Sequence, residues 1–578
     1  MDIDVYYLVM RPSRYGRTRR VPRERRSTSV PEPRHGEPAH FIVCGASQLA
    51  RLVARSLTDT GASVILLTPA SGSESDSDSD ISSGVEVVVS DELDERAFRT
   101  AGLLRACGVA LLHDEDMTNV QAALCVQEVA PASRLVLSMS DLTLARTLGL
   151  RMTQVEAFSA TAIAVPAFVA AALGTESPSY FRYRGRTLFV TRRSEVPASN
   201  VVCGVADVRD PQRHRLLPPV ERDADVVLAE AVGGEPGTER AARRIRRPPS
   251  RSVAAARMLR TLTGRKINLA AAGAVALTAL LGVLLARTQP DRTAWQAIYL
   301  TVITTVTGGE LDASSAPNVQ IMQVALTLTG LALIPLITAA IVQHRRHPSP
   351  TRRVHHVVIV GVGELGSQVL RRLRDMRVHV LAVDRNAEAL GVLSAPDTQI
   401  PAITADATRK SVLQSASVHQ CHALLALTGC ERTNVHVSML GRAMRSDLPV
   451  VLRIIDGHIT TRARRSFDVG TALGVPQLAA PSFTASLLGL TVVATIPIGS
   501  LVLLAVEYVV RRGIFPDAET IAGLTRMGIR VLGVATSLYD EFIWSPGPQR
   551  ELTDGCRILA VGIPGDLFAV LRAEGQQT

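Results

Sequence analysis

Residues 357–386 read VVIVGVGELGSQVLRRLRDMRVHVLAVDRN, an apolar strand, a glycine-rich turn, an amphipathic helix and a second apolar strand ending in Asp384. Gly361, Gly363 and Gly366 form the pattern G-x-G-x-x-G at the start of the helix. In this pattern the first glycine allows a tight turn and the second lets a pyrophosphate approach the backbone. The third lets helix and strand pack closely. The spacing predicts a nucleotide-binding α/β fold.

The predicted nucleotide site extends beyond the glycines. A helix N-terminus favours phosphate, and Asp384 is placed to accept hydrogen bonds from ribose hydroxyls. We expect the ligand to be NAD(H) or an adenine nucleotide. The predicted nucleotide-binding residues are Gly361, Gly363, Glu364, Leu365, Gly366, Asp384, Arg385, Asp406 and Ala407.

A second stretch of the chain has the same organisation. Residues 40–68, HFIVCGASQLARLVARSLTDTGASVILLT, again read as strand, turn, helix and strand, and both stretches continue with further strands and helices. This alternation predicts a doubly wound parallel sheet, and its recurrence predicts a duplicated domain. The earlier copy keeps only Gly45 of the three glycines and has Thr68 where the acid is expected. We expect it to bind no dinucleotide, or a different ligand.

Length and composition limit the classes of protein to which the chain can belong. The 578 residues suggest three or four domains, and 47% apolar with 20% charged residues is typical of a folded chain. The net charge of +10 fits nucleic acid, anionic lipid or basic loops beside membrane spans, and its location favours the membrane. The seven cysteines include no C-x-x-C pair, which predicts buried thiols in a reducing compartment. No secretory signal opens the chain, and residues 1–37 are interpreted as a disordered Arg-rich tail.

Two uncharged runs, 267–286 and 319–342, have the length of membrane-spanning helices. Both outer flanks are strongly basic, so the positive-inside rule predicts two spans in the cell membrane with both termini cytoplasmic. A third apolar run, 486–506, is split by Pro497 and Gly499. We interpret it as a helix plus a strand within a soluble domain, with a membrane contact as the alternative.

The segment between the two runs has the pattern of a re-entrant pore loop. Residues 293–304 form an apolar helix too short to cross a bilayer, and backbone at that depth survives only if it is buried in protein or lines water. Carbonyls and Thr hydroxyls after it are suited to replace the water shell of a cation, with Glu310 as an acidic ring at the outer mouth. The predicted filter residues are Thr304, Thr305, Val306, Thr307, Gly308, Gly309 and Glu310.

These features together resemble a potassium channel with RCK (regulator of potassium conductance, TrkA-N-like) domains. The family string T-V-G-Y-G-D corresponds to residues 305–310, TVTGGE, where Thr307 replaces a glycine and Gly308 the aromatic residue. The resemblance implies a homotetramer in the lipid bilayer that conducts cations, with K⁺ as the expected ion. It also implies a cytoplasmic ring of RCK lobes that gates the pore on ligand binding. Gly330 and Pro335 are candidate hinges, with plain helix packing as the alternative.

The resulting plan has two RCK domains around a two-helix, all-α pore unit, and each RCK domain has a nucleotide-binding lobe and a small β-rich lobe. The predicted segments are the tail 1–37, first RCK-like domain 38–240, basic linker 241–266, pore domain 267–343 (spans 267–286 and 319–342, pore helix 293–304, filter 305–309), linker 344–354 and second RCK domain 355–578 (lobes 355–480 and 481–578).

Other functions remain as alternatives. One is a membrane-tethered RCK subunit that regulates a separate transporter, and another is a non-selective cation channel. An NAD-dependent oxidoreductase is disfavoured because we find no catalytic constellation, and because the chain has a membrane unit where a dehydrogenase would need a substrate domain. No H-E-x-x-H, G-x-S-x-G or P-loop pattern occurs either, so we expect no enzyme. Because the basic residues flank the predicted spans, we expect no nucleic-acid partner. The acidic run 71–80, SGSESDSDSD, is interpreted as a flexible loop, with divalent cation capture as the alternative and Ca²⁺ as a further candidate ligand.

Overall fold

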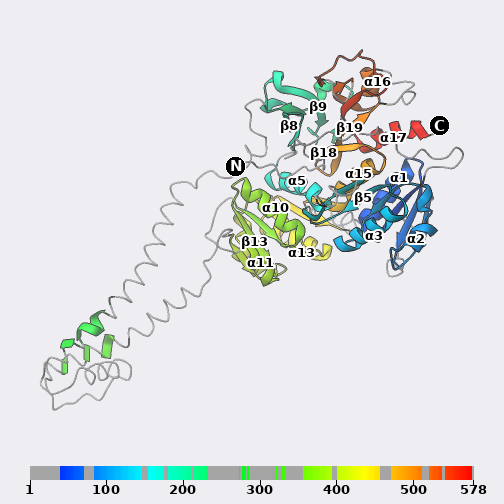
Figure 1. The fold of residues 1–578 in the computed structure, drawn as a ribbon. Helices are drawn as coiled ribbons and strands as arrows, with labels where there is room; N and C mark the ends of the chain where they lie inside the picture. The colour runs from blue at the N-terminus through cyan, green and yellow to red at the C-terminus, as the bar shows by residue number, and fades with distance from the viewer. Residues whose placement is uncertain are drawn as a thin grey trace, which may run out of the picture. The chain divides into compact units, whose positions relative to one another are not determined.

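The computed structural model describes twelve continuous or nearly continuous parts of the chain. They are residues 40–69, 84–141, 143–145, 147, 154–174, 180–210, 214–231, 356–393, 400–455, 470–510, 520–536 and 541–575, together with scattered positions between 273 and 331. The chain divides into two compact units, residues 1–246 with 355–578, and residues 247–354. All elements discussed below belong to the first unit (Figure 1).

The first α/β lobe, called a nucleotide-binding lobe here after its predicted fold, contains a six-stranded parallel sheet in the order β3-β2-β1-β4-β5-β6. Its elements are β1 (His40–Cys44), α1 (Gln48–Asp59), β2 (Ser63–Thr68), β3 (Val85–Val89), α2 (Glu95–Thr100), β4 (Ala106–Leu111), α3 (Asp116–Val129), β5 (Arg134–Ser138) and β6 (Val155–Phe158). The central strand β1 lies between β2 and β4, and its residues Ile42, Val43 and Cys44 are fully buried. Strands buried on both faces are near-continuous apolar runs, as this sheet requires.

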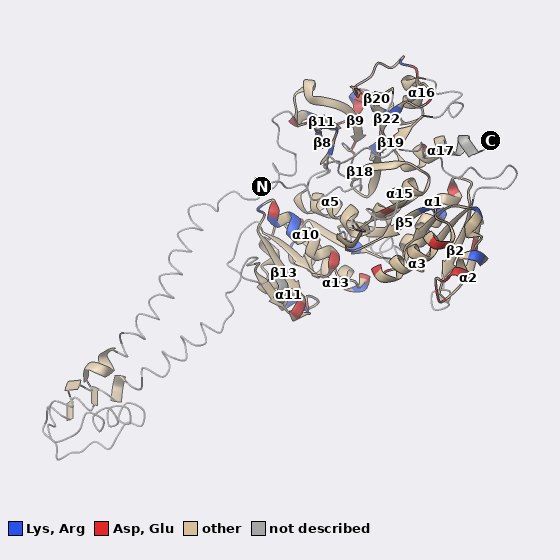
Figure 2. Cartoon of the chain, in the orientation of Figure 1, with Lys and Arg blue, Asp and Glu red and all other residues tan. Residues whose placement is uncertain are grey.

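The second lobe repeats this topology, with the order β14-β13-β12-β15-β16-β17. Its elements are β12 (Val357–Val360), α10 (Glu364–Asp375), β13 (Val380–Asp384), α11 (Ala387–Leu393), β14 (Ala402–Thr404), α12 (Lys410–Ser415), β15 (Ala423–Ala426), α13 (Glu431–Met444), β16 (Val450–Ile454) and β17 (Thr471–Gly474). The predicted duplicated, doubly wound parallel sheet is confirmed. Charged residues lie on helices such as α2, α10 and α13 (Figure 2).

Each nucleotide-binding lobe is followed by a five-stranded antiparallel sheet. The first sheet has the order β10-β9-β11-β8-β7 and the second β18-β19-β22-β20-β21. Their strands are β7 (Tyr180–Tyr183), β8 (Arg186–Arg192), β9 (Val201–Asp207), β10 (Arg215–Leu216), β11 (Val226–Glu230), β18 (Thr491–Ile498), β19 (Leu501–Val509), β20 (Ile529–Ala535), β21 (Ile543–Trp544) and β22 (Arg557–Gly562), and the second sheet adds α16 (Ile521–Arg526) and α17 (Pro564–Gly575). The two sheets share one apolar core.

Polar contacts also join the two β-rich lobes. Tyr183 on β7 donates its hydroxyl to Glu507 on β19 at 3.0 Å, and Glu507 forms a buried ion pair with Arg557 on β22. The Arg530 guanidinium donates to the carbonyl of Pro218 at 2.6 Å. Because buried charged groups are costly unless paired, these contacts fix how the two lobes meet.

Two helices each pack on the parallel sheet of the other copy. Helix α5 (Ala160–Leu173) follows the first sheet but packs on α10 and on the strands β15, β16 and β17 of the second. Helix α15 (Val475–Leu487) follows the second sheet but packs on α1, β4 and β5 of the first. Phe483 on α15 meets Phe158 edge-to-face, with ring centroids 5.4 Å apart. Each nucleotide-binding lobe therefore completes its core with a helix from the other copy.

The predicted apolar run 486–506 folds as the end of α15 followed by two strands, β18 and β19, which pair antiparallel around Gly499. The expected helix is present, but one expected strand is a hairpin of two. Elsewhere, the predicted spans, pore helix, filter residues 304–310 and hinges Gly330 and Pro335 lie largely or wholly outside the described residues. Across the described parts of the chain, no helix combines the length and apolarity needed to cross a bilayer.

Candidate functional site

The glycine turn after β12 is shaped by two glycines whose surroundings leave no room for a Cβ atom. Gly361 has a φ of 91°, and a Cβ there would lie 2.7 Å from the backbone nitrogen of Thr428. A Cβ on Gly366 would overlap the carbonyl oxygen of Gly361. The close approach of α10 to the turn therefore depends on both glycines, as the sequence pattern predicts.

Gly363 is different because no described residue crowds it. Within the described part of the chain, no atom lies within 4 Å of an added Cβ, and its φ of −67° suits any residue. Gly363 is the exposed N-cap residue of α10, and no side chain caps the helix there. The first backbone N–H groups of α10 are thus open to a ligand, and the missing side chain leaves room for it.

Asp384 at the end of β13 stabilises this turn through two hydrogen bonds to backbone N–H groups. Its Oδ2 accepts a hydrogen bond from the Val362 backbone N–H at 2.6 Å, and its Oδ1 accepts one from the Asn386 N–H at 2.9 Å. The predicted acid therefore lies beside the glycine turn. Each carboxylate oxygen keeps a further lone pair, so bracing the turn and accepting from a ribose hydroxyl are compatible.

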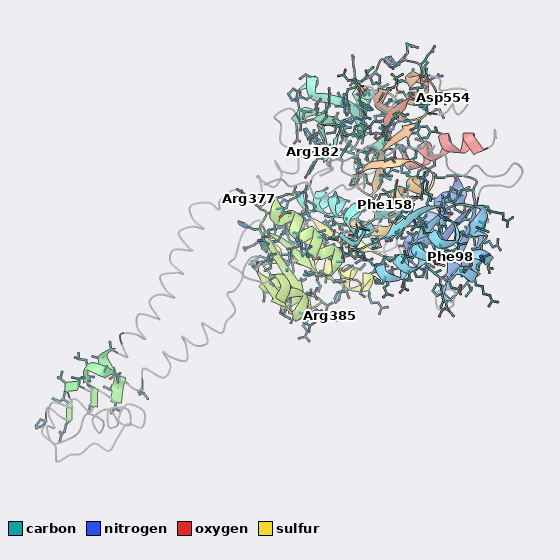
Figure 3. All side chains as sticks on the ribbon, in the orientation of Figure 1. Phe98, Phe158, Arg182, Arg377, Arg385 and Asp554 are labelled. Carbon is teal, nitrogen blue, oxygen red and sulfur yellow. The ribbon has the colours of Figure 1, made fainter. Side chains whose placement is uncertain are left out.

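The other predicted site residues lie along the same edge of the sheet. Asp406 follows β14, and its Oδ1 accepts from the backbone N–H and the hydroxyl of Thr408 at 3.0 and 2.7 Å. These hydrogen bonds hold the pKa of Asp406 below its ordinary value. Ala407 is buried, whereas Arg385 is exposed at the end of β13 and is labelled in Figure 3. Leu365 packs into the core, and Glu364 is exposed at the start of α10.

Asn434 is a site residue that sequence reasoning missed. It is fully buried on α13, accepts from the Thr428 N–H at 2.9 Å, and donates to the carbonyls of Thr428 and Arg453 at 3.0 Å each. The side chain thereby joins the ends of β15 and β16 beside the glycine turn. Its presence in both copies of the stretch that follows the fourth strand, HDEDMTN and TGCERTN, was the available signal.

The first copy has the same arrangement, in which a buried asparagine joins the ends of two strands. Asn119 on α3 is fully buried, accepts from the His113 N–H at 3.0 Å, and donates to the carbonyls of His113 and Ser138 at 2.9 and 2.8 Å. Gly45 also keeps a positive φ, 138°, and a Cβ there would lie 2.7 Å from the Leu112 carbonyl oxygen. The two copies therefore share the frame of the site.

The turn of the first copy differs at the other glycine positions. Ser47 stands where Gly363 stands in the second copy, and its hydroxyl caps α1 by accepting from the Ala50 N–H at 3.4 Å. Ala50 occupies the position of Gly366 and is fully buried. Thr68 ends β2 in place of Asp384 and supplies no carboxylate. The N-terminus of α1 is therefore capped by the protein's own hydroxyl, in contrast to that of α10.

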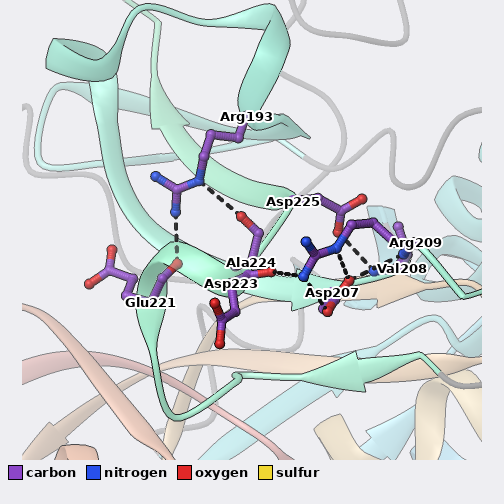
Figure 4. A network of polar contacts seen from close by, with 8 residues as sticks. All are labelled: Arg193, Asp207, Val208, Arg209, Glu221, Asp223, Ala224 and Asp225. Atoms are coloured by element: carbon purple, nitrogen blue, oxygen red, sulfur yellow. Dashed lines mark hydrogen bonds and ion pairs between the residues drawn. The ribbon is translucent and has the colours of Figure 1, made fainter.

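The β-rich lobe of the first copy contains a separate polar network (Figure 4). The Arg193 guanidinium donates to the carbonyls of Ala224 and Glu221 at 2.9 and 2.8 Å. The Arg209 guanidinium donates one hydrogen bond to each oxygen of the Asp207 carboxylate, at 2.8 and 2.7 Å. The Arg209 contact lowers the pKa of Asp207 to about 2. These contacts tie loops together. Among the described residues, no cluster of three or more His, Cys, Asp and Glu forms a metal site.

The cysteines are mostly as expected. Cys44, Cys203, Cys421 and Cys556 are buried, and Cys107 and Cys125 are half-buried. Cys430 is the exception, because it is exposed as the N-cap residue of α13. The prediction of buried thiols is wrong at that position, where the chain turns outward after β15.

Comparison with known proteins supports the domain assignment. The TrkA-N domain family model matches residues 41–155 and 357–467, which are the two nucleotide-binding lobes. The chain is 30% identical over 101 residues to a protein described as "Trk system potassium uptake protein TrkA homolog" from Pyrococcus horikoshii, covering 18% of this chain and 44% of the relative. An uncharacterized protein of Methanothermus fervidus is 20% identical over 201 residues, covering 32% of this chain and 30% of the relative. The chain thus spans less than half the length of these two relatives.

Solved structures include the RCK domain of GsuK, with a TM-score of 0.48 at 12% sequence identity, covering 95% of this chain and 98% of that one. The GsuK channel bound to NAD gives a TM-score of 0.45 at 12% identity, covering 94% of this chain and 80% of that one. Together, the family matches and the two parallel sheets define the repeated part of the molecule. The chain carries two stretches that match the TrkA-N domain model, one before and one after residues 247–354.

Proposed function

We propose that the second RCK domain binds NAD(H) or an adenine nucleotide at the turn between β12 and α10. The observation that carries this proposal is Gly363, a glycine that neither backbone conformation nor packing within the protein requires. A glycine at an exposed helix N-terminus leaves space and free N–H groups for a diphosphate. Asp384 beside the turn supplies an acceptor for the ribose. The role proposed is binding, not catalysis.

We further propose that this binding regulates potassium transport. Support comes from the curated relative named as a potassium uptake protein and from the sequence between the RCK domains. In this proposal the chain is a homotetramer in the cell membrane, and residues 267–343 form a cation pore gated by the RCK domains. K⁺ is the proposed ion, and the departures from the family filter string at Thr307 and Gly308 make a less selective cation pore the alternative. Ca²⁺ is retained as a further candidate ligand.

A second candidate is an RCK subunit tethered to the membrane that controls a separate transporter. The observation that favours it is that the family matches, residues 41–155 and 357–467, both fall outside the segment 267–343. Both candidates share the nucleotide site, so they differ in whether the chain itself conducts ions.

Binding is tested first. The full-length chain is purified in lipid nanodiscs and titrated with NADH and with ADP by calorimetry. We expect saturable binding to one site per chain, and Gly363→Asp to weaken it at least tenfold because a carboxylate then occupies the phosphate position. Gly565→Asp is the matched control, since Gly565 also has open space around it and lies at the start of α17. Equal affinity of G363D and wild type would refute the placement of the site.

Conduction is tested separately. Protein reconstituted in planar bilayers is exposed to a K⁺/Na⁺ gradient with and without the nucleotide that binds. Current that changes with nucleotide supports the channel, and the reversal potential reports selectivity. Binding without current under any nucleotide favours the tethered regulatory subunit.

A further inference from the structure

The end of α10 carries exposed arginines that the nucleotide site does not use. Arg371 and Arg374 are three positions apart, so they lie on one face of the helix, and both are exposed. Arg377 follows in the turn after the helix and is exposed as well. Asp375 is the acid within residues 371–379, so this stretch, RRLRDMRVH, has four arginines and one carboxylate. We call Arg371, Arg374 and Arg377 the α10 patch.

Stabilisation of the helix accounts for only part of this cluster. The helix dipole favours cations in the last turn, which explains Arg372 and Arg374. Arg377 lies beyond the helix and has a φ of 56°, in the left-handed region that favours glycine at a helix end. An arginine at this position strains the backbone, so neither the helix dipole nor the backbone conformation explains it.

The first copy lacks this excess of positive charge. Its corresponding stretch, residues 55–63, reads RSLTDTGAS and has one arginine and one carboxylate. Arg55 is the counterpart of Arg371 and is exposed. Thr58 and Gly61 stand at the positions of Arg374 and Arg377. The basic surface is therefore a property of the second copy and is not required by the fold that the two copies share.

The α10 patch lies at the end of the lobe where the second copy begins. The backbone N–H of Val357, the first residue of β12, donates to the carbonyl of His379 at 2.8 Å, two residues after Arg377. This is the end of β12 at which the chain arrives from residues 247–354, and it is opposite to the glycine turn. The 14 residues from 343 to 356, between the second predicted span and β12, can bridge at most about 50 Å.

A strand of the first β-rich lobe adds to this basic surface. The Arg372 guanidinium lies over the ring of Tyr180 on β7, 5.4 Å from its centroid, so β7 is beside the end of α10. Arg182 is two positions further along β7, on the same face of the strand as Tyr180, and is exposed. Figure 3 labels Arg182 and Arg377. Positive charge at this end of the lobe therefore comes from two separate elements.

We propose that the α10 patch binds anionic lipid headgroups on the cytoplasmic face of the membrane. This inference rests on the proposed membrane location of the chain, and it adds a surface by which the second copy contacts the bilayer. Guanidinium groups suit phosphate because each donates several hydrogen bonds in a fixed geometry. Each arginine close to an anionic bilayer strengthens binding by about fivefold. The contact would leave the glycine turn, at the other end of β12, accessible to a nucleotide.

The reactivity of the arginines tests the proposal. The full-length chain is placed in nanodiscs of phosphatidylcholine alone or with about 30% phosphatidylglycerol, and an arginine-selective dicarbonyl reagent is followed by mass spectrometry. We expect Arg371, Arg374 and Arg377 to react about threefold or more slowly in the anionic discs. Salt at about 1 M, where the Debye length is about 3 Å, should remove the difference. Arg55 is the matched control and should react equally in both discs.

Neutral variants test whether the arginines act together. In a protein with Arg374→Gln and Arg377→Gln, the protection of Arg371 by anionic lipid should be largely lost, because two of the three charges that hold the headgroups are gone. Arg55→Gln should leave that protection unchanged. ADP affinity should equal that of wild type in both variants, since the glycine turn lies at the other end of β12, and this measurement confirms that the second copy is folded.

The possible outcomes separate this inference from the proposed function. Equal reactivity of the α10 patch in the two kinds of disc overturns the inference, and slow reaction in both would mean that protein covers the patch. A chain that the discs do not retain refutes the proposed membrane location together with this inference. Protection by anionic lipid without any binding of ADP supports the lipid contact and refutes only the proposed nucleotide site.

Discussion

The two copies of the α/β lobe have the same sheet and the same buried asparagine, and they differ in the turn between the first strand and the first helix. Both sheets have the same strand order, both have a buried asparagine that joins two strand ends, and both begin with a glycine of positive φ. The second domain has open space at Gly363, whereas the first has Ser47 capping its helix. The first copy thus folds with Ser47 and Ala50 at the positions of the second and third glycines. In the second copy Gly366 is required by its contact with Gly361, whereas no contact among the described residues requires Gly363.

The comparison also shows where the copies depend on each other. Helices α5 and α15 each complete the sheet of the other copy, and the two antiparallel sheets share a core. The first copy, whose turn has only one of the three glycines, thus still forms half of a common structure. This gives a physical reason why its buried residues match those of the second copy while its turn differs.

The largest effect is expected from Gly366→Ala. An added Cβ would overlap the carbonyl of Gly361, so the turn or α10 must shift. Overpacking costs about 1–3 kcal/mol and occasionally more, and we expect G366A near the upper end because the overlap is with backbone. The shift should also abolish the proposed nucleotide binding. The matched change in the first copy is Ala50→Gly, which adds only the cost of a helical glycine, about 1 kcal/mol. Thermal unfolding and ADP titration of both variants measure the difference, and a G366A protein with normal affinity would contradict it.

A nearly equal effect in both copies is expected from removing the buried asparagines. Asn434→Leu and Asn119→Leu each leave one backbone N–H and two carbonyls without their partner. Unsatisfied buried groups cost about 1–3 kcal/mol each, so we expect about 3 kcal/mol for either variant. Chemical denaturation followed by circular dichroism tests this. A much smaller effect in the first copy would show that its frame is eroded as well.

The sequence predicted those parts of the molecule that depend on neighbouring residues. The strand before Gly361, the helix after it and the acid at position 384 are local patterns, and all three are present. The role of Asn434 was not predicted because its partners come from two separate parts of the chain: Thr428 follows β15, and Arg453 lies on β16. The spacing of apolar residues indicates one helix or strand at a time. A side chain that bonds to the ends of two strands can be recognised only once those strands are known to be adjacent.

The exchange of α5 and α15 was not predicted for a different reason. The sequence of α5, ATAIAVPAFVAAAL, is apolar on all sides, so no polar face indicates which sheet it covers. Pro166 within α5 and Pro481 within α15 do not indicate which sheet each helix covers either. Choice of partner depends on the packing of Phe168 and Phe483 in the two cores, which is a tertiary property.

A smaller, pH-dependent effect distinguishes the two exchanged helices. Glu156 on β6 accepts from the Ser486 hydroxyl of α15 at 2.5 Å, and burial raises the pKa of this carboxyl above its ordinary value of 4.5. The folded state then binds more protons than the unfolded state, so stability is full below pH 4.5 and falls as pH rises through the folded pKa.

The variant Glu156→Gln removes this titration and can still accept from Ser486. We expect its free energy of unfolding to lie within about 1 kcal/mol of wild type at neutral pH. Relative to E156Q, wild type should become less stable as pH rises from 4 toward 7. Thr471, its neutral counterpart on β17, provides the control Thr471→Val, which should shift stability equally at all pH values. Parallel pH profiles of wild type and E156Q would contradict the shift.

The smallest effect concerns a turn that differs between the copies. After α1 the chain turns at Gly61, with a φ of 84°, and at the corresponding place after α10 stands Arg377, with a φ of 56°. A residue with a side chain is strained there, whereas glycine is not. Arg377→Gly should therefore stabilise the second domain by up to about 1 kcal/mol, and Gly61→Ala should destabilise the first by a similar amount. Because both turns end the same helix of the same fold, opposite signs in thermal unfolding are the expected result. A destabilising R377G would mean that the arginine side chain makes a compensating contact that outweighs the strain.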